Sequence, residues 1–112
     1  MLRIHPRTVA AFEADVLADQ RRRFVEWLHA HRATVGEVPP GAAMQVLEEA
    51  RAEATAEGAD ADEQLFVFAA ARGMMPAMTG PQYLLVMDVV FSSDNDIVRT
   101  TRLAAIKGGQ LG

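Results

Sequence analysis

The chain has 112 residues, a length that predicts a single domain, and half of its residues are apolar, as in chains that fold around a core. Fifteen acidic residues against eleven basic ones give a net charge of −4, which argues against nucleic acid as the main partner. The sequence has no cysteine, which excludes disulfide bonds, thiol nucleophiles and cysteine-ligated metals.

No stretch is long and apolar enough for a transmembrane helix, and the first six residues lack the apolar core of a signal peptide. We therefore expect a soluble, cytoplasmic protein that does not bind membranes. The whole chain, 1–112, is expected to form one domain, structured over about 6–107, with a loose tail over 108–112.

The first predicted element is a long amphipathic helix over residues 6–33, which Pro6 can begin. Gln20 and Glu13 interrupt its apolar face, and Trp27 on that face suggests a surface for a homodimer. The residues of this face recur at helical spacing: Val9, Phe12, Val16, Phe24, Trp27, Leu28 and His31.

Residues 34–39, with Gly36 and Pro39, form a connector to a second helix. This helix is predicted from Pro40 to Glu57, and Gly58 ends it. Its inner face is apolar and includes small residues that let a neighbouring helix approach closely: Ala43, Met44, Leu47, Ala50 and Ala54.

A third helix is predicted from Ala61 to Arg72, ended by Gly73. Asp60 is expected to be its N-cap, with Glu63 three residues later as partner in a partial capping box. Because residues 65–71 are apolar nearly all round, this helix is expected at the centre of the domain.

Within the segment 81–91, residues 83–91 are apolar except for one acid, and their periodicity fits a buried helix or a buried strand. We favour a helix, because a lone strand would leave its backbone groups without partners. A last helix is predicted from Asn95 to Lys107, capped by Ser93 or Asp94. The sequence thus predicts an all-α, compact single-domain bundle of about five helices with a long N-terminal helix.

Titratable residues give no catalytic or metal-binding pattern, and we expect no cofactor. His29 and His31 are two residues apart on a helix, so they point in nearly opposite directions and cannot share a metal. Asp88 lies among apolar residues and is expected to be buried. It is predicted to pair with Arg99 or Arg102, and a functional acid is the alternative.

Two features suit recognition of another protein. Glu49, Glu53 and Glu57 recur every four residues and form an acidic ridge, with Glu48 beside them. The ridge can meet a basic partner, pair internally with the arginines at 21–23, or remain a solvated face.

The second feature is a cluster of methionines, Met74, Met75 and Met78, in a predicted loop over 74–80. Flexible thioethers fill irregular gaps in cores and also line adaptable binding surfaces. On the binding interpretation, replacing all three by serine should weaken partner binding and leave the fold intact.

The order of these signals resembles a family of small helical accessory proteins encoded beside type VI secretion spike and toxin genes. The likeness covers residues 4–75, with a weaker match to about 106, and after Gly73 the methionines replace the acidic or aromatic segment of the relatives. It is carried by Trp27-Leu28-His29-Ala30-His31, Arg51-Ala52 before Gly58, Asp62-Glu63, Phe68 and Gly73.

The resemblance implies a non-enzymatic adaptor or chaperone for a secreted effector or spike component, and it supplies no catalytic residue. The partner would be another protein: an effector, a toxin or a spike component. One alternative is an immunity protein that neutralises a cognate toxin. A further alternative is a small enzyme or regulator that uses Asp88 or His31.

Overall fold

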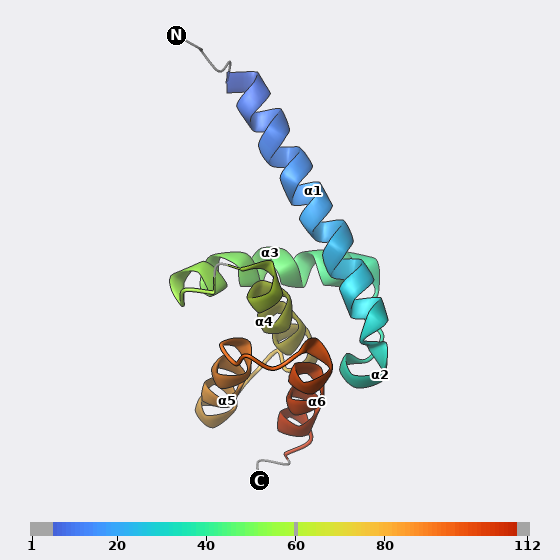
Figure 1. Ribbon diagram of the computed structural model, residues 1–112, viewed down its shortest axis with the longest axis vertical. Helices are drawn as coiled ribbons and strands as arrows, with labels where there is room; N and C mark the ends of the chain where they lie inside the picture. The colour runs from blue at the N-terminus through green and yellow to red at the C-terminus, as the bar shows by residue number, and fades with distance from the viewer. Residues whose placement is uncertain (1–5, 60, 110–112) are drawn as a thin grey trace.

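The computed structural model describes residues 6–59 and 61–109, with side chains from Ala14 onward. These residues are mostly helical and contain no strand, so the predicted all-α class is confirmed. The helices are α1 (Pro6–Ala30), α2 (Arg32–Val35), α3 (Pro40–Ala56), α4 (Asp62–Met74), α5 (Gly80–Val90) and α6 (Asp96–Lys107). Figure 1 shows α3 lying across one end of α4, with α5 and α6 on the side of α4 away from α1's free end.

The predicted first helix is interrupted near its end, which makes six helices rather than about five in the described ranges. His31 leaves the helical conformation at φ −106° and ψ 18°, and its carbonyl accepts from Thr34 and Val35 to start α2. The turn buries Val35 and closes at Gly36, whose φ of 82° favours glycine. Burial of Val35 thus redirects the chain without a proline or glycine at the break.

The ends of α3 follow the predictions closely, whereas both ends of α4 differ from them. Gly58, at φ 85°, follows α3 as predicted. Asp60 lies outside the described residues, and α4 begins after Ala61, whose N–H donates to Gln64 Oε1 at 3.4 Å. The side chain that accepts from the backbone at the start of α4 is therefore that of Gln64. The prediction that Glu63 fills this role is wrong. At its other end α4 continues past Gly73 and includes Met74.

The segment 81–91 is a helix, as favoured. Thr79 begins it with a capping box that the sequence analysis missed: Thr79 Oγ1 accepts from Gln82 N at 3.2 Å, and Gln82 Oε1 accepts from Thr79 N at 2.9 Å. The last helix is capped by Asn95, whose Oδ1 accepts from Val98 N at 3.0 Å, and the predicted caps one or two residues earlier are wrong.

The core is centred on α4, as predicted. Every residue from Leu65 to Ala71 is buried, so this helix contacts neighbours on all its sides. Phe24 and Leu28 bring the second half of α1 to it, and the Phe24 and Phe66 ring centroids are 5.2 Å apart. From α3, Ala43, Leu47, Ala50 and Ala54 are buried as predicted, whereas Met44 is 43% exposed.

The first half of α1 extends beyond the rest of the molecule (Figure 1). The principal extents of 58 × 26 × 25 Å reflect this projection. Val16, predicted on the apolar face of the helix, is 49% exposed because it lies in the part of α1 that extends beyond the other helices (Figure 1). Within the described ranges, no helix combines the length and the apolar character needed to cross a bilayer.

Candidate protein-interaction site

A groove runs between α3 and the last turn of α4, and it joins the acidic ridge to the segment that follows α4. We call it the α3–α4 groove, and its volume is about 370 Å³. Its lining residues are Val46, Glu49, Ala50, Glu53, Arg72, Gly73 and Pro76. The two flanking features are visible separately in the sequence, whereas their proximity depends on the packing of α3 against α4.

Small residues keep this groove open. Ala50 and Ala54 are buried where α3 meets α4, which lets the two backbones lie close together. Gly73 of α4 faces Val46 of α3, and a Cβ added at position 73 would lie 3.8 Å from both methyl groups of Val46. A larger side chain at position 73 would therefore fill part of the groove.

The acidic residues of the ridge differ in how far their charges are neutralised. Glu53 forms an ion pair with Arg72, whose guanidinium also lies 5.5 Å from the centroid of the Phe68 ring. Glu49 is exposed and accepts only an amide hydrogen bond from Gln45, at 3.2 Å, within the described part of the chain. Glu49 therefore contributes most of the uncompensated charge to the groove wall.

The lining of the groove carries a net negative charge, because Glu49 and Glu53 outnumber Arg72. α4 ends beside it, and the carbonyl end of a helix carries partial negative charge. Glu57, at the far end of the ridge, is exposed. Burial raises the pKa of the Tyr83 hydroxyl, and the neighbouring carboxylates of Glu57 and Glu53 raise it further. Tyr83 therefore stays protonated beside these acids and can donate a hydrogen bond to them.

The methionines mainly fill the core. Met75 is buried at 6% exposure, and Met74 and Met78 are half-buried against the core. Pro76 and Ala77 are exposed between them, and Pro76 lines the α3–α4 groove. Of the segment 74–78, it is therefore Pro76 rather than a methionine that borders the candidate site.

Glu48, beside the ridge, forms ion pairs within the chain. Pairing with the arginines at 21–23 was one of the alternatives predicted for these acids. The carboxylate of Glu48 accepts from Arg21 of α1 and from Arg51 of α3, both at 2.6 Å. The hydrogen bond from Arg21 lowers the pKa of the Glu48 carboxyl against a smaller opposing effect of burial, and the charges of both arginines add to the lowering. Of the other two arginines in the run 21–23, Arg22 pairs with Asp19 and Glu26 and Arg23 pairs with Asp19 and Asp62, so neither pairs with the ridge.

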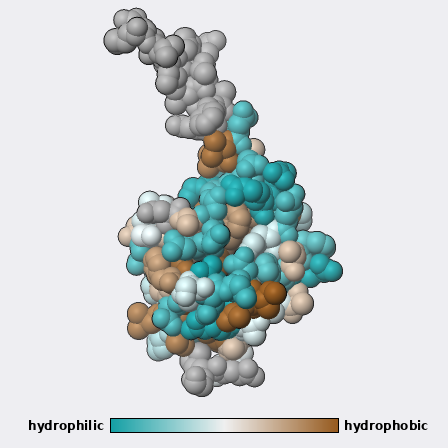
Figure 2. All heavy atoms as spheres, viewed as in Figure 1, coloured by the Kyte–Doolittle hydropathy of each residue, from teal (hydrophilic) through white to brown (hydrophobic). Residues whose placement is uncertain are grey.

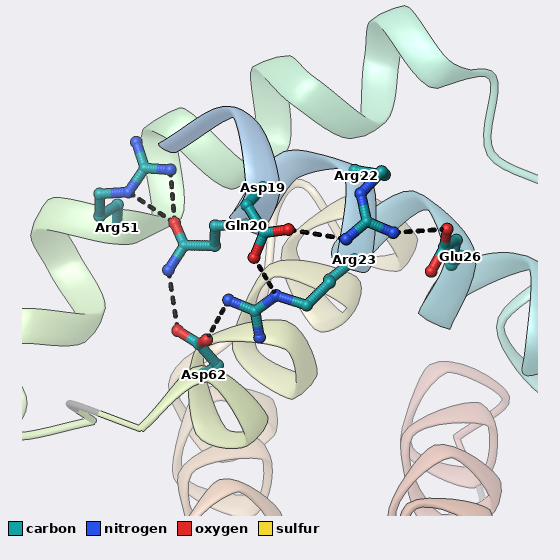
Figure 3. A network of polar contacts seen from close by, with 7 residues as sticks. All are labelled: Asp19, Gln20, Arg22, Arg23, Glu26, Arg51 and Asp62. Carbon is teal, nitrogen blue, oxygen red and sulfur yellow. Dashed lines mark hydrogen bonds and ion pairs between the residues drawn. The ribbon is translucent and has the colours of Figure 1, made fainter. Parts of the chain in front are cut away.

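A polar network that the sequence analysis missed joins α1 to α3 and α4 (Figure 3). Gln20 accepts from Arg51 at 2.7 Å and donates to Asp62 at 2.9 Å. Arg23 also reaches Asp62, at 2.7 Å, and pairs with Asp19 of its own helix at 2.9 Å. The spacing of Asp19 and Arg23 in the sequence predicts their ion pair, whereas the interruption of the apolar face at Gln20 is the signal of the contacts from α1 to α3 and α4.

The structure places Asp88 at the surface, so its predicted burial is wrong. Its side chain is 72% exposed and pairs with Arg102 at 3.0 Å, and this partner is one of the two predicted. Leu84, on the same face of α5, and Phe91, directly after the end of α5, are also exposed. The apolar neighbours of Asp88 in sequence therefore do not enclose it in space.

Arg99, the other predicted partner, is buried and donates to the carbonyl of Ser92 instead. Its Nη1 lies 3.6 Å from Asp96 Oδ1, and Asp96 also accepts from the indole nitrogen of Trp27 at 3.0 Å. The His31 ring packs on Trp27, with centroids 4.8 Å apart. Trp27, which suggested a dimer surface, is therefore occupied within the chain. Within the described ranges, the acids and histidines form no cluster of three that could hold a metal ion.

A second surface missed by the sequence analysis lies on α5, α6 and their connection. Figure 2 shows brown, apolar atoms in the lower half of the body, where Figure 1 places these helices. The large exposed apolar side chains of this region are Leu84, Phe91, Ile97 and Val98. Leu84 and Phe91 could not be distinguished from core residues in the sequence, because residues 83–91 are apolar except for Asp88.

Comparison of the chain with protein-family models, with curated proteins and with solved structures returned no match. The resemblance to type VI secretion accessory proteins therefore rests on the residues quoted for it.

Proposed function

We propose that the chain is a non-enzymatic protein-interaction module that binds a basic segment of another protein in the α3–α4 groove. The observation that carries the proposal is the joining of Glu49, Glu53 and the carbonyl end of α4 around one groove. A lysine or arginine side chain of a partner would be attracted by the exposed carboxylate of Glu49 and by the dipole of α4.

The apolar parts of the groove suit the stem of such a side chain. Val46, Ala50 and Pro76 offer apolar contacts beside the carboxylates. Long basic side chains bury their methylene groups on apolar surface while the charged end remains near acids or water. The groove thus combines carboxylates for the charged end of a basic side chain with apolar surface for its stem.

The resemblance to accessory proteins of type VI secretion supplies the proposed context. In it, the partner is a secreted effector or a spike component, and the chain acts as its adaptor or chaperone in the cytoplasm. An exposed acidic groove on a small helical protein is compatible with either role, because both need a reversible protein contact.

An immunity protein is the alternative that the acidic groove also favours. A toxin that acts on an anionic substrate has a basic active site, which an acidic surface can block. The third alternative, an enzyme using Asp88 or His31, gains no such support, because Asp88 is a surface residue paired with Arg102 and His31 packs on Trp27.

The test is co-purification of the tagged chain from its host, followed by identification and quantification of the bound protein. We expect a partner in near-equal amount, and we expect Glu49→Lys to weaken its binding about tenfold, or about 1.4 kcal/mol. Glu37→Lys is the matched control, because Glu37 is exposed and lies outside the groove. Equal retention of the partner by the two variants would contradict the proposal.

Coexpression then separates the two protein-binding roles. An adaptor or chaperone raises the amount of intact effector in the cell, whereas an immunity protein protects cells from the toxin without that rise. In both cases binding is expected to weaken at high salt, since the contact is electrostatic and partly exposed.

A further inference from the structure

In the projecting part of α1, the described side chains are mostly exposed. From Ala14 to Asp19, the described side chains form no hydrogen bond or ion pair with another helix, and the first such contact is made by Gln20. Ala14, Asp15, Val16 and Ala18 are all exposed. Isolated helical segments of about 12–15 residues are marginally stable in water, so this part of α1 would gain from a partner.

A second groove lies directly below this projection. Its volume is about 410 Å³, and it runs between α1 and the beginning of α3. Its lining residues are Ala18, Arg21, Arg22, Val25, Glu26, Pro40 and Met44. Met44 is 43% exposed there, although it is a large apolar side chain. We call this second groove the α1–α3 groove.

One face of α1 belongs to both the projection and the α1–α3 groove. Ala14, Ala18 and Val25 recur at intervals of four and seven residues, which places them on the same side of a helix. Val16, two residues before Ala18, points to nearly the opposite side. The groove therefore continues along the projecting helix as an exposed surface of small side chains.

We propose that a second copy of this chain docks its projecting α1 antiparallel in the α1–α3 groove, with the two helices crossing at Ala18. In a twofold dimer of this kind each groove receives the projecting helix of the other copy, so every contact away from the twofold axis is made twice. The small side chains at Ala14 and Ala18 let the two helices approach closely.

Charge complementarity selects the second copy as the occupant and sets the direction. Asp15 lies three residues before Ala18 and Arg22 four residues after it, or about 4.5 Å and 6 Å along the helix axis. An antiparallel crossing at Ala18 therefore places Asp15 of each copy opposite Arg22 of the other. A parallel pair would instead place Asp15 opposite Asp15 and Arg22 opposite Arg22.

The absence of cysteine from the sequence allows a direct test by disulfide crosslinking. The variant Ala18→Cys places the two sulfurs at the crossing point, where the helices are closest. The variant Val16→Cys is the matched control, because position 16 is exposed on the same helix but faces the other way. Under mild oxidation we expect Ala18→Cys to form covalent dimers at least about tenfold faster than Val16→Cys. Equal rates, or faster crosslinking of Val16→Cys, would overturn the proposal.

Sedimentation of the native chain and of charge variants provides the second measurement. We expect a dimer whose dissociation constant rises about tenfold in Asp15→Arg, since two like-charge contacts replace two attractive ones. Adding Arg22→Asp to that variant should restore the dimer. The proposal would be contradicted by a native chain that remains monomeric at high micromolar concentration. It would also be contradicted by a double variant whose dimer dissociates as readily as that of Asp15→Arg. Circular dichroism confirms in each case that the variant is folded.

Discussion

Gln20 illustrates how much one polar residue on an apolar helix face can organise. Its amide accepts from Arg51 on one side and donates to Asp62 on the other, so it uses both of its polar groups across helices. A hydrophobic residue would have continued the apolar face of α1 and left both Arg51 and Asp62 without this partner. The network fixes how α1 leaves the body of the molecule.

Asp62 is the acid of this network that a pH experiment can isolate. Partial burial raises the pKa of its carboxyl, but the hydrogen bonds from Gln20 and Arg23 and the charge of Arg23 outweigh that effect and leave the pKa lowered. A lowered pKa in the folded state means that the carboxylate stabilises the fold above its unfolded pKa. That stability is lost as the pH falls through the folded-state pKa.

We therefore expect Asp62→Asn to reduce the free energy of unfolding by about 0.5–1 kcal/mol at neutral pH, because the partly exposed ion pair with Arg23 is lost. The difference from the native chain should shrink as the pH falls through the lowered pKa. Denaturant unfolding at several pH values measures it. Glu63→Gln is the matched control in the same helical turn, and an equal effect there would show that the network contributes nothing.

At the scale of the elements, proline and glycine made most helix boundaries predictable. Pro40 begins α3, and Gly58 follows its end with a positive φ that other residues rarely adopt. The break at His31 was not predictable, because it depends on burial of Val35 against the rest of the fold. For the same reason the sequence could not show that Asp88, among apolar neighbours, lies on an exposed face.

The central position of α4 predicts a large effect of Phe68→Ala. Phe68 is fully buried, so the substitution leaves a cavity and should lower the free energy of unfolding by about 3–5 kcal/mol. Thermal and denaturant unfolding measure this loss. Phe91→Ala is the control, since Phe91 is 47% exposed and its loss should be much smaller. Equal effects of the two substitutions would show that α4 is not the centre of the core.

The segment after α4 requires a change to an expectation drawn from the sequence. Replacing Met74, Met75 and Met78 by serine was expected to leave the fold intact, but Met75 is buried and the other two pack against the core. We now expect Met75→Ala alone to cost about 2–5 kcal/mol in unfolding free energy. Denaturant unfolding of this variant, with Ala77→Ser as control at an exposed neighbour, measures the cost. A midpoint unchanged from the native chain would show that Met75 is not part of the core.

At the scale of the whole molecule, the two grooves arise where helices distant in the sequence meet. The acidic ridge was visible in the sequence because Glu49, Glu53 and Glu57 recur at helical spacing. Its proximity to Pro76 was not visible, because it depends on how α3 crosses α4. The projection of α1 was equally hidden, since a helical pattern does not show where the rest of the fold ends.

The most direct test of the proposed function is hydrogen exchange of the chain alone and in complex with the protein that co-purifies with it. The account predicts slower exchange on binding in residues 46–57 and 72–77, the two segments that border the α3–α4 groove. Protection confined to α5 and α6, or unchanged exchange along both groove segments in the complex, would contradict it.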